Sequence, residues 1–413
     1  MLASIPVRPV SLQRYADFLE EEELAEIQRL AAQLRGAKVI HINTTAFGTR
    51  VADMIGVMGG LMLDLGIDCR WQVLRVTSEL VSIFQRIYDA SQDSNITWDA
   101  ESASTWLEYS AQQASRFDGE YDYVIVHDPQ TVPLLNQITA SRGMRPGGAW
   151  LWHCHLDLGQ ANPEIRRFLA SHASAYDAVL AEMESYLYGE DLPNPQVILP
   201  AIDPLNPRNA DLSPDTVPAL LASLGLSSDQ PLISQISNLE PAVDPMGAIA
   251  AWRLARQQVP NLQMIMAFPG ILFGSATHSL FHQVVREIQA DADIRVLSPL
   301  DGVGNLEVNL LRQASSAVLQ RSIGKGFGLV VAEAMWKSKP VVAGRCGGIP
   351  LQIVEGETGY LVDTVETCAE RLAFLAQNPD LAREMGSRGR EMVRSRFLIT
   401  RYLRDYLSSL LSL

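Results

Sequence analysis

Short apolar runs alternate with longer stretches of helical periodicity along most of the chain, and no other feature constrains the possible folds as strongly. The first unit has an apolar strand at 38–42, a polar turn at 43–50 and helical spacing over 51–65, before Gly66 ends the helix. A strand, a turn and a helix in this order open a doubly wound parallel sheet. Further strands are predicted at 69–74, 122–126 and 149–153, with helices at 12–34, 78–90, 103–117 and 163–174.

The alternation stops once, at the Pro-, Asn- and Asp-rich segment 200–216, and then resumes. A chain of 413 residues exceeds the size of a single core, so two domains are expected. We predict an α/β chain with Rossmann-like domains over 1–203 and 204–395, and a last helix in 396–413 that crosses back to bury its apolar face on the first domain. The second half is predicted to have strands at 231–236, 262–267, 293–297 and 316–320, and helices at 247–257, 277–290 and 305–314.

Composition excludes several classes of partner. A net charge of −14 and a pI near 5.0 argue against nucleic acid or an anionic membrane, because both require basic surfaces. No apolar run approaches the ~18 residues of a membrane span, and the N-terminus lacks a basic start followed by an apolar core, so we expect a cytoplasmic protein. The four cysteines contain no CxxC pair, which argues against a disulfide framework or a zinc site.

The richest local motif is the triplet Gly326, Phe327 and Gly328 before an apolar stretch without Gly or Pro. This pattern predicts a helix that starts at the second glycine, where free N–H groups and the helix dipole favour an anion such as a phosphate. Glu333 lies about two turns into the helix and on roughly the same face as Lys325. A ligand along the helix N-terminus would reach both. The continuation predicts a strand at 340–343, a glycine turn at 347–348, a short helix at 351–354 and a strand at 360–362.

In order and spacing these segments resemble the retaining glycosyltransferases of family 4, and within that family the trehalose synthase group. The resemblance implies the GT-B fold, in which two Rossmann-like domains face a central cleft. It also implies transfer of a glucosyl group from a nucleotide-sugar (UDP-, ADP- or GDP-glucose) to a small sugar acceptor, with no further cofactor and with a homodimer as an option for assembly. The segments that carry it are 34–45, 121–130, 150–159, 197–209, 302–328 and 396–410.

Several polar residues in the first half match positions of this family. The turn before Arg50 stands where the family has a glycine-rich loop, yet only Gly48 remains, and Arg50 either meets a phosphate or faces water. His127 and Gln130 follow a predicted strand and match family residues that face the acceptor sugar. The alternative is a simple turn capped by Asp128.

A second polar cluster follows the strand at 149–153. Alternation along a strand places His153, His155 and Asp157 on one side, a set that would suit a metal in a different setting. The resemblance argues against a metal, because family members hold the diphosphate with protein groups. His155 and Asp157 match the family, whereas His153 replaces an arginine. We expect His155 in the cleft; the alternative is a half-buried histidine that bonds a backbone carbonyl.

The second half departs from the family at charged positions. Asn238 and Met246 stand where family members have the Arg and Lys that neutralise the leaving diphosphate, and Lys325 replaces the first Glu of a pair whose second member is Glu333. Losing two such charges would cost roughly 10⁴ in rate unless other groups replace them. Arg50, Arg321 and Lys325 are the candidate replacements.

These residues define the expected site and leave two function classes open. One is a retaining sugar transferase; the other is a catalytically impaired GT-B protein with a binding or regulatory role. The expected catalytic residues are His155, Asp157 and Lys325, and the expected substrate-binding residues are Arg50, His127, Gln130, Asn238, Arg321, Gly326, Phe327, Gly328 and Glu333.

Overall fold

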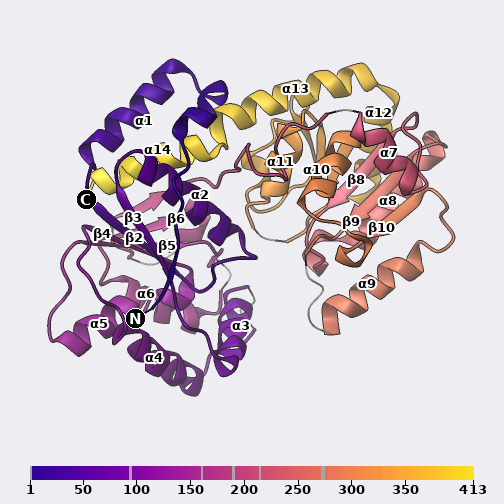
Figure 1. Cartoon of the computed structure of the whole chain (residues 1–413). Helices are drawn as coiled ribbons and strands as arrows, with labels where there is room; N and C mark the ends of the chain where they lie inside the picture. Colours follow the sequence, from indigo (N-terminus) through magenta and orange to yellow (C-terminus); the bar gives the residue numbers. More distant parts are fainter. Residues whose placement is uncertain are drawn as a thin grey trace. The chain divides into compact units, whose positions relative to one another are not determined.

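The computed structural model describes residues 2–92, 95–159, 161–187, 191–213, 215–270, 275–324 and 326–413. The chain forms two compact units (Figure 1). The first unit consists of Met1–Pro200 and Ile399–Leu413, and the second of Ala201–Leu398. The corresponding boundaries predicted from the sequence are 203 and 395. No helix among the described residues is long and apolar enough to cross a membrane.

The first unit contains a seven-stranded sheet in the order β1-β3-β2-β4-β5-β6-β7. All neighbouring strands run parallel except β1, which lies antiparallel to β3. The order reverses between β2 and β4, and ligands of doubly wound sheets bind outside the carboxyl ends of the strands at such a switch point. The strands are β1 (Ala3–Ile5), β2 (Lys38–Asn43), β3 (Asp68–Val73), β4 (Tyr123–His127), β5 (Ala149–Cys154), β6 (Ala178–Ala181) and β7 (Pro195–Val197).

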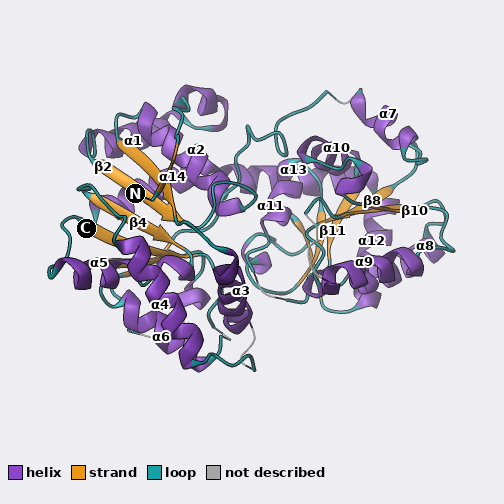
Figure 2. Ribbon diagram, turned by 60° about the horizontal axis from the view of Figure 1, so that its bottom comes forward, coloured by secondary structure: helices purple, strands orange, loops and turns teal. Residues whose placement is uncertain are grey.

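Helices cover both faces of this sheet (Figure 2). The helix predicted over 12–34 is wrong in one respect, because it is two helices separated at Leu19 and Glu20. Glu20 has an extended backbone, and its N–H donates to the Glu23 carboxylate at 3.1 Å, which starts a new helix. The helices are η1 (Leu12–Phe18), α1 (Glu21–Gln33), α2 (Arg50–Asp64), α3 (Ser78–Gln92), α4 (Ala100–Ala114), η2 (Pro129–Thr131), α5 (Leu134–Arg142), α6 (Pro163–Ala173), η3 (Glu184–Leu187) and α14 (Ile399–Leu411).

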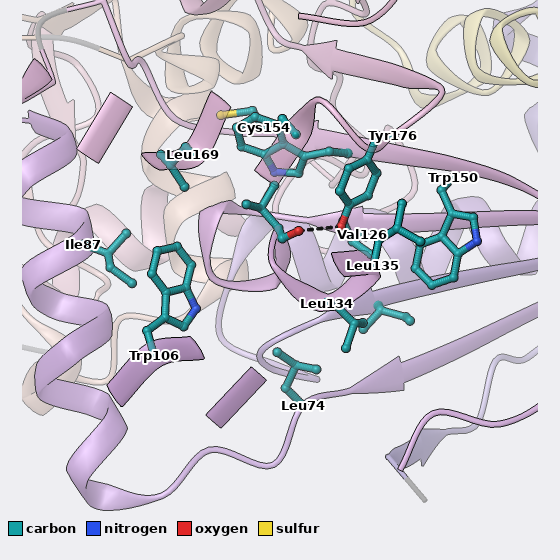
Figure 3. Close-up of a cluster of buried hydrophobic side chains, with 14 of the residues drawn as sticks. Leu74, Ile87, Trp106, Val126, Leu134, Leu135, Trp150, Cys154, Leu169 and Tyr176 are labelled. Carbon is teal, nitrogen blue, oxygen red and sulfur yellow. Dashed lines mark hydrogen bonds between the residues drawn. The ribbon is translucent and has the colours of Figure 1, made fainter. Parts of the chain in front are cut away.

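The two faces of this sheet differ in chemistry. On one face, alternate residues of β2, β4 and β5 join an apolar core that includes Val126, Trp150 and Tyr176 (Figure 3). The Tyr176 hydroxyl donates to the Val132 carbonyl at 2.8 Å, so its polar end is satisfied within the core. The intervening positions of the same strands put buried histidines on the opposite face, namely His41, His127 and His153.

The last helix, α14, packs against α1 and α2 of the first unit (Figure 1). Leu403 and Leu407 are fully buried, and Tyr402 and Tyr406 lie beside the histidines. The chain therefore closes the first unit with its final residues.

The second unit contains a six-stranded, wholly parallel sheet in the order β10-β9-β8-β11-β12-β13, which reverses between β8 and β11. Its strands are β8 (Leu232–Ile236), β9 (Gln263–Ala267), β10 (Ile294–Leu297), β11 (Ala317–Gln320), β12 (Val341–Gly344) and β13 (Gly359–Val362). Its helices are α7 (Thr216–Ser223), η4 (Pro241–Val243), α8 (Pro245–Gln258), α9 (Ser275–Glu287), η5 (Pro299–Asp301), α10 (Asn305–Ala314), α11 (Leu329–Trp336), η6 (Ile349–Leu351), α12 (Val365–Gln377) and α13 (Pro379–Arg396).

The helix predicted to start at the second glycine of the triplet is confirmed, since Gly328 is the N-cap of α11. The short helix predicted at 351–354 lies earlier, at Ile349–Leu351. Both candidate regions of this unit, the segment after β8 and the glycine triplet after β11, follow the two strands that flank the switch point.

Leu407→Ala tests the role of α14. Because Leu407 is fully buried, its truncation should lower the free energy of unfolding of the first unit by about 2–5 kcal/mol. Urea unfolding with hydrogen exchange on β5 peptides would measure this. Leu413→Ala is the matched control, because Leu413 is 42% exposed and should change stability by less than about 0.5 kcal/mol. Equal stability of the two variants would show that α14 does not stabilise the first unit.

Candidate functional site

A continuous chain of side-chain hydrogen bonds runs through the first unit at the switch point of its sheet. Nδ1 of His41 is 2.9 Å from Nε2 of His127, and Nδ1 of His127 is 3.0 Å from Nε2 of His155. Nδ1 of His155 then lies 3.1 Å from Oε1 of Glu182, which also accepts from Arg50 at 2.6 Å. Five side chains from distant parts of the sequence thus form one network.

The carboxylate at one end sets the direction of the network while the imidazoles are neutral. Glu182 can only accept, so His155 carries its proton on Nδ1 and accepts through Nε2. His127 must then donate from Nδ1, and His41 donates from Nδ1 to His127. Nε2 of His41 is left unprotonated, which agrees with its lack of a hydrogen-bond partner among the described residues.

Burial keeps these groups in defined charge states. Desolvation lowers the pKa of His41 to about 3. It also holds the pKa of His127 and of His153 well below the usual range, with neighbouring histidines adding to the effect. Desolvation would raise the pKa of Glu182, but the charge of Arg50 and the hydrogen bond from His155 outweigh it, so the pKa lies below its usual value. The network therefore combines neutral His41 and His127 with an ion pair between the buried Glu182 and the partly exposed Arg50.

His153 joins the cluster from the neighbouring strand. Its Nδ1 lies 2.9 Å from the Tyr406 hydroxyl of α14, and its ring centroid lies 4.0 Å from that of His155. One ring nitrogen each from His127, His153 and His155 lies within 4.8 Å of the others. The alternation that put His153 and His155 on one side holds for these two rings. It fails for Asp157, because β5 ends at Cys154 and the Asp157 carboxylate instead accepts from the Gly159 N–H at 2.8 Å.

The alternative in which His155 bonds a backbone carbonyl is wrong, because both of its ring nitrogens bond side chains.

Arg50, expected to meet a phosphate or face water, pairs with Glu182, and its side chain keeps 43% of its surface exposed. It lies in the first turn of α2, where Thr49 caps the helix by accepting from the Ala52 N–H at 3.2 Å. An anionic ligand would have to share or displace this carboxylate.

Asp128 follows β4 in a backbone conformation that suits glycine, with φ 67° and ψ 162°. Its side chain makes no capping hydrogen bond, so the simple capped turn does not describe this segment. Burial raises the pKa of its carboxyl group. Two residues further on, Oε1 of Gln130 is buried without a hydrogen-bond partner among the described residues. Backbone strain and an unpaired buried acceptor are both features of binding sites.

In the second unit, two glycine turns lie in contact around the predicted phosphate loop. Gly326 and Gly328 have φ of 110° and 76°. The Gly348 N–H donates to the Gly326 carbonyl at 2.9 Å, and a Cβ on Gly347 would lie 2.0 Å from that oxygen. Glycine is therefore required at 347 for the close approach of the two turns.

Gln352 anchors this loop from within. Its Nε2 donates to the Phe327 carbonyl at 2.6 Å, and its Oε1 accepts from the Ala332 N–H of α11 at 3.1 Å. Phe327, expected to bind substrate, is 2% exposed, and its ring packs on Phe397 with centroids 5.9 Å apart. Its side chain is therefore part of the core, and only its backbone could contact a ligand.

Glu333 is held by two arginines. Arg312, fully buried, donates to one carboxylate oxygen, and Arg208 lies 3.9 Å from the other. The side chain of Glu333 is 11% exposed. The carboxylate is thus already charge-paired before any ligand binds, a role that the resemblance did not imply.

The segment after β8 carries a second ion pair. Oδ2 of Asp244 lies 3.3 Å from Nε of Arg321 without hydrogen-bond geometry, while Oδ1 caps α8 by accepting from Gly247 N–H at 3.0 Å. Asn238 is exposed and Met246 packs on the core of the second unit. Arg321 is therefore a cation that follows β11 at the switch point of this sheet, and it is already paired with a carboxylate.

Lys325, the third candidate cation, lies outside the described residues. A hollow of about 570 Å³ in this unit is lined by Pro231, Ser316, Lys339 and neighbours at the amino ends of β8, β11 and β12. It is at the edge of the sheet opposite the glycine triplet, and ligands of parallel sheets bind at carboxyl ends. We therefore do not assign it to the candidate site.

Comparison with known proteins identifies relatives along the whole chain. The family model "Trehalose synthase, N-terminal domain" matches residues 41–188, and "Glycosyl transferases group 1" matches residues 218–392. A trehalose synthase of Rubrobacter xylanophilus is 36% identical over 405 residues, which cover 96% of this chain and 95% of that relative. A trehalose synthase of Thermococcus litoralis is 35% identical, with 97% and 96% covered. The chain belongs to the trehalose synthase family of glycosyltransferases.

Solved structures show the same fold at low identity. Sucrose-phosphate synthase from Thermosynechococcus elongatus matches with a TM-score of 0.68 at 16% identity, covering 91% of this chain and 99% of that one. The Anabaena protein HepE, in complex with UDP and glucose, matches with a TM-score of 0.63 at 16% identity, covering 91% and 100%. The predicted GT-B fold and the assignment as a glycosyltransferase are confirmed.

Several residues that complete the hydrogen-bond network of the first unit were not predicted from the sequence. His41 was read only as part of a strand, and Glu182 follows β6, a strand that was not predicted. Tyr406 lies in the last helix, for which the sequence predicts only an apolar face, yet its hydroxyl bonds His153. A polar residue inside or just after an apolar run, as at His41 and Glu182, was the signal that could have found them.

Asp128→Gly tests whether the turn after β4 stores strain. Glycine adopts this conformation without a Cβ clash, so the variant should raise the free energy of unfolding of the first unit by about 1 kcal/mol, after the entropic cost of glycine. Thermal unfolding would measure it, with Asp128→Asn as the control that removes the charge but keeps the Cβ. A glycine variant no more stable than the asparagine variant would disprove stored strain.

Glu333→Gln tests the ion pair in the second unit. Removing the charge leaves Arg312 buried without a carboxylate, which should cost about 3 kcal/mol of unfolding free energy. The double variant Arg312→Met/Glu333→Leu removes both charges and should regain most of that loss. Denaturant unfolding measures the free energy of unfolding of the single and the double variant. Equal losses in both would show that packing, and not the charge pair, sets the cost.

Proposed function

We propose that this member of the family transfers a glucosyl group, with retention at the anomeric carbon, from a nucleotide-sugar to a small sugar such as glucose. The observation that carries the proposal is identity of 36% to a trehalose synthase over 96% of the chain, with no domain left unmatched by that alignment. Both units also carry their polar networks at the switch points of doubly wound sheets, where ligands of this fold class bind.

The second unit is assigned to the donor. In this proposal Gly326 and Gly328 let the diphosphate approach the start of α11, and Glu333 accepts from the ribose hydroxyls. Arg321 would stabilise the leaving diphosphate by turning from Asp244 to the phosphates. The diphosphate itself accepts the proton of the attacking hydroxyl, so no protein nucleophile is required. UDP-, ADP- and GDP-glucose are the candidate donors, and no further cofactor is proposed.

The first unit is assigned to the acceptor. Gln130 offers an unpaired carbonyl oxygen to a sugar hydroxyl, and His127 and His155 form the fixed polar wall beside it. Asp157 is held in place by the Gly159 N–H and has a second carboxylate oxygen for a hydroxyl. Neutral imidazoles and amides suit an uncharged sugar acceptor.

A binding role without turnover is the second candidate. It is favoured by one observation: Arg50 and Arg321 are both paired with carboxylates, while Asn238 and Met246 carry no charge. If these pairs persist when a nucleotide-sugar binds, the diphosphate would lack the charge that its departure requires.

Incubation with each of the three nucleotide-glucoses and free glucose tests the proposal. Proton NMR should show α,α-trehalose, and Gln130→Met should raise KM for glucose by about 2–10-fold while KM for the donor stays unchanged. A thermal-shift series with the same nucleotides separates the candidates, because binding raises the melting temperature without turnover. Stabilisation by a nucleotide-sugar without any product would overturn the transferase and support the binding role.

A further inference from the structure

Adjacent strands of the first unit bring His127, His153 and His155 together in an arrangement that goes beyond the acceptor wall assigned to His127 and His155. His127 ends β4 and His153 is its direct partner on β5, so the strand register fixes their separation. His155 follows β5 on the same side as His153. The side chains of all three are nearly or wholly buried.

Each of these three imidazoles uses one ring nitrogen for a partner outside the group. That leaves the other nitrogen for the interior of the group, which is the arrangement of metal-binding histidines whose second nitrogen is held by a protein group. The outer partners are Nδ1 of His41 for His127, the hydroxyl of Tyr406 for His153 and the carboxylate of Glu182 for His155.

The inner nitrogens have the spacing of a coordination site. Nδ1 of His127 and Nε2 of His155 are 3.0 Å apart, close to the about 3.3 Å between two nitrogens that share a tetrahedral zinc ion. Nε2 of His153 is buried and has no hydrogen-bond partner among the described residues. One ring nitrogen from each histidine lies within 4.8 Å of the others, so the rings have to move closer together for one ion to bind all three.

From this geometry we propose that His127, His153 and His155 form a binding site for one transition-metal cation of the zinc class, such as Zn²⁺ or Co²⁺. Three imidazole nitrogens suit these cations and not Mg²⁺ or Ca²⁺, which prefer oxygen. Three protein ligands leave one position for water or a small ligand. Cys154 is not a ligand, because its thiol donates to the Leu156 carbonyl and belongs to the apolar core.

Protonation in the first unit is compatible with such a site. Metal ligation requires imidazoles whose inner nitrogen carries no proton. On binding, the proton of His127 ends on Nε2 instead of Nδ1, and that of His41 ends on its own Nε2. No proton is lost in this exchange of tautomers. Because Nε2 of His41 then becomes a buried donor without a partner among the described residues, we expect an affinity on the order of micromolar.

Titration of the EDTA-treated full chain with Co²⁺ alone, followed by visible absorption, tests the site. The expected result is one equivalent bound with the d–d bands of a four- or five-coordinate ion, and displacement by Zn²⁺. His153→Phe, which keeps a ring of similar size, should weaken binding at least 100-fold. Tyr406→Phe, which removes only the outer hydroxyl, should weaken it about 10-fold, as second-shell changes do.

The exposed pair His278 and His282, one turn apart on α9, supplies the control. The double variant His278→Gln/His282→Gln should leave the bound equivalent and its spectrum unchanged. Should His153→Phe fail to fold by circular dichroism, His155→Gln carries the same expectation. Loss of binding in the α9 double variant, retention of full affinity in the folded variants of the cluster, or no bound Co²⁺ in the wild type would overturn the proposal.

Discussion

A single hydrogen bond between the Tyr406 hydroxyl and His153 joins the end of the chain to the centre of its first sheet. The face of β2, β4 and β5 opposite the apolar core presents histidines, which would be costly to bury without partners. Helix α14 covers this face with apolar residues and supplies the one hydroxyl that His153 bonds. Without that cover, the network from His41 to Glu182 would open to water and lose its fixed direction.

The second unit also holds its buried charged side chains by pairing them with partners from other elements. In this unit two arginines are paired with carboxylates, Arg321 with Asp244 and Arg312 with Glu333. A guanidinium held by a carboxylate has already lost much of its side-chain entropy. Because Asn238 and Met246 carry no charge, an anionic ligand of this unit would have to draw these arginines away from their carboxylates.

Much of this architecture could be predicted from the sequence. Long periodic segments such as 51–65 and buried runs such as 231–236 correspond to α2 and β8. Elements that the sequence did not predict include β1 and β7, which have three residues each and are too short to show a period, and α5, which is interrupted by polar side chains. The strand β6 and the long helices α12 and α13 were not predicted either. The local pattern singled out Glu333 and the glycine triplet, and resemblance matched His127 and His155 to family positions. It could not give the partners of these residues, because Glu182, Tyr406 and Arg312 are far away in sequence and meet them only through tertiary packing.

Because the first unit includes α14, which follows the whole second unit along the chain, its fold is complete only after α14 has been synthesised. The second unit is continuous, and all of its residues leave the ribosome before α14 does. Until then the sheet face that carries the histidines has no cover, and a nascent chain that stops early would display it to chaperones and proteases. The second unit can therefore complete its fold before the first unit, which precedes it along the chain.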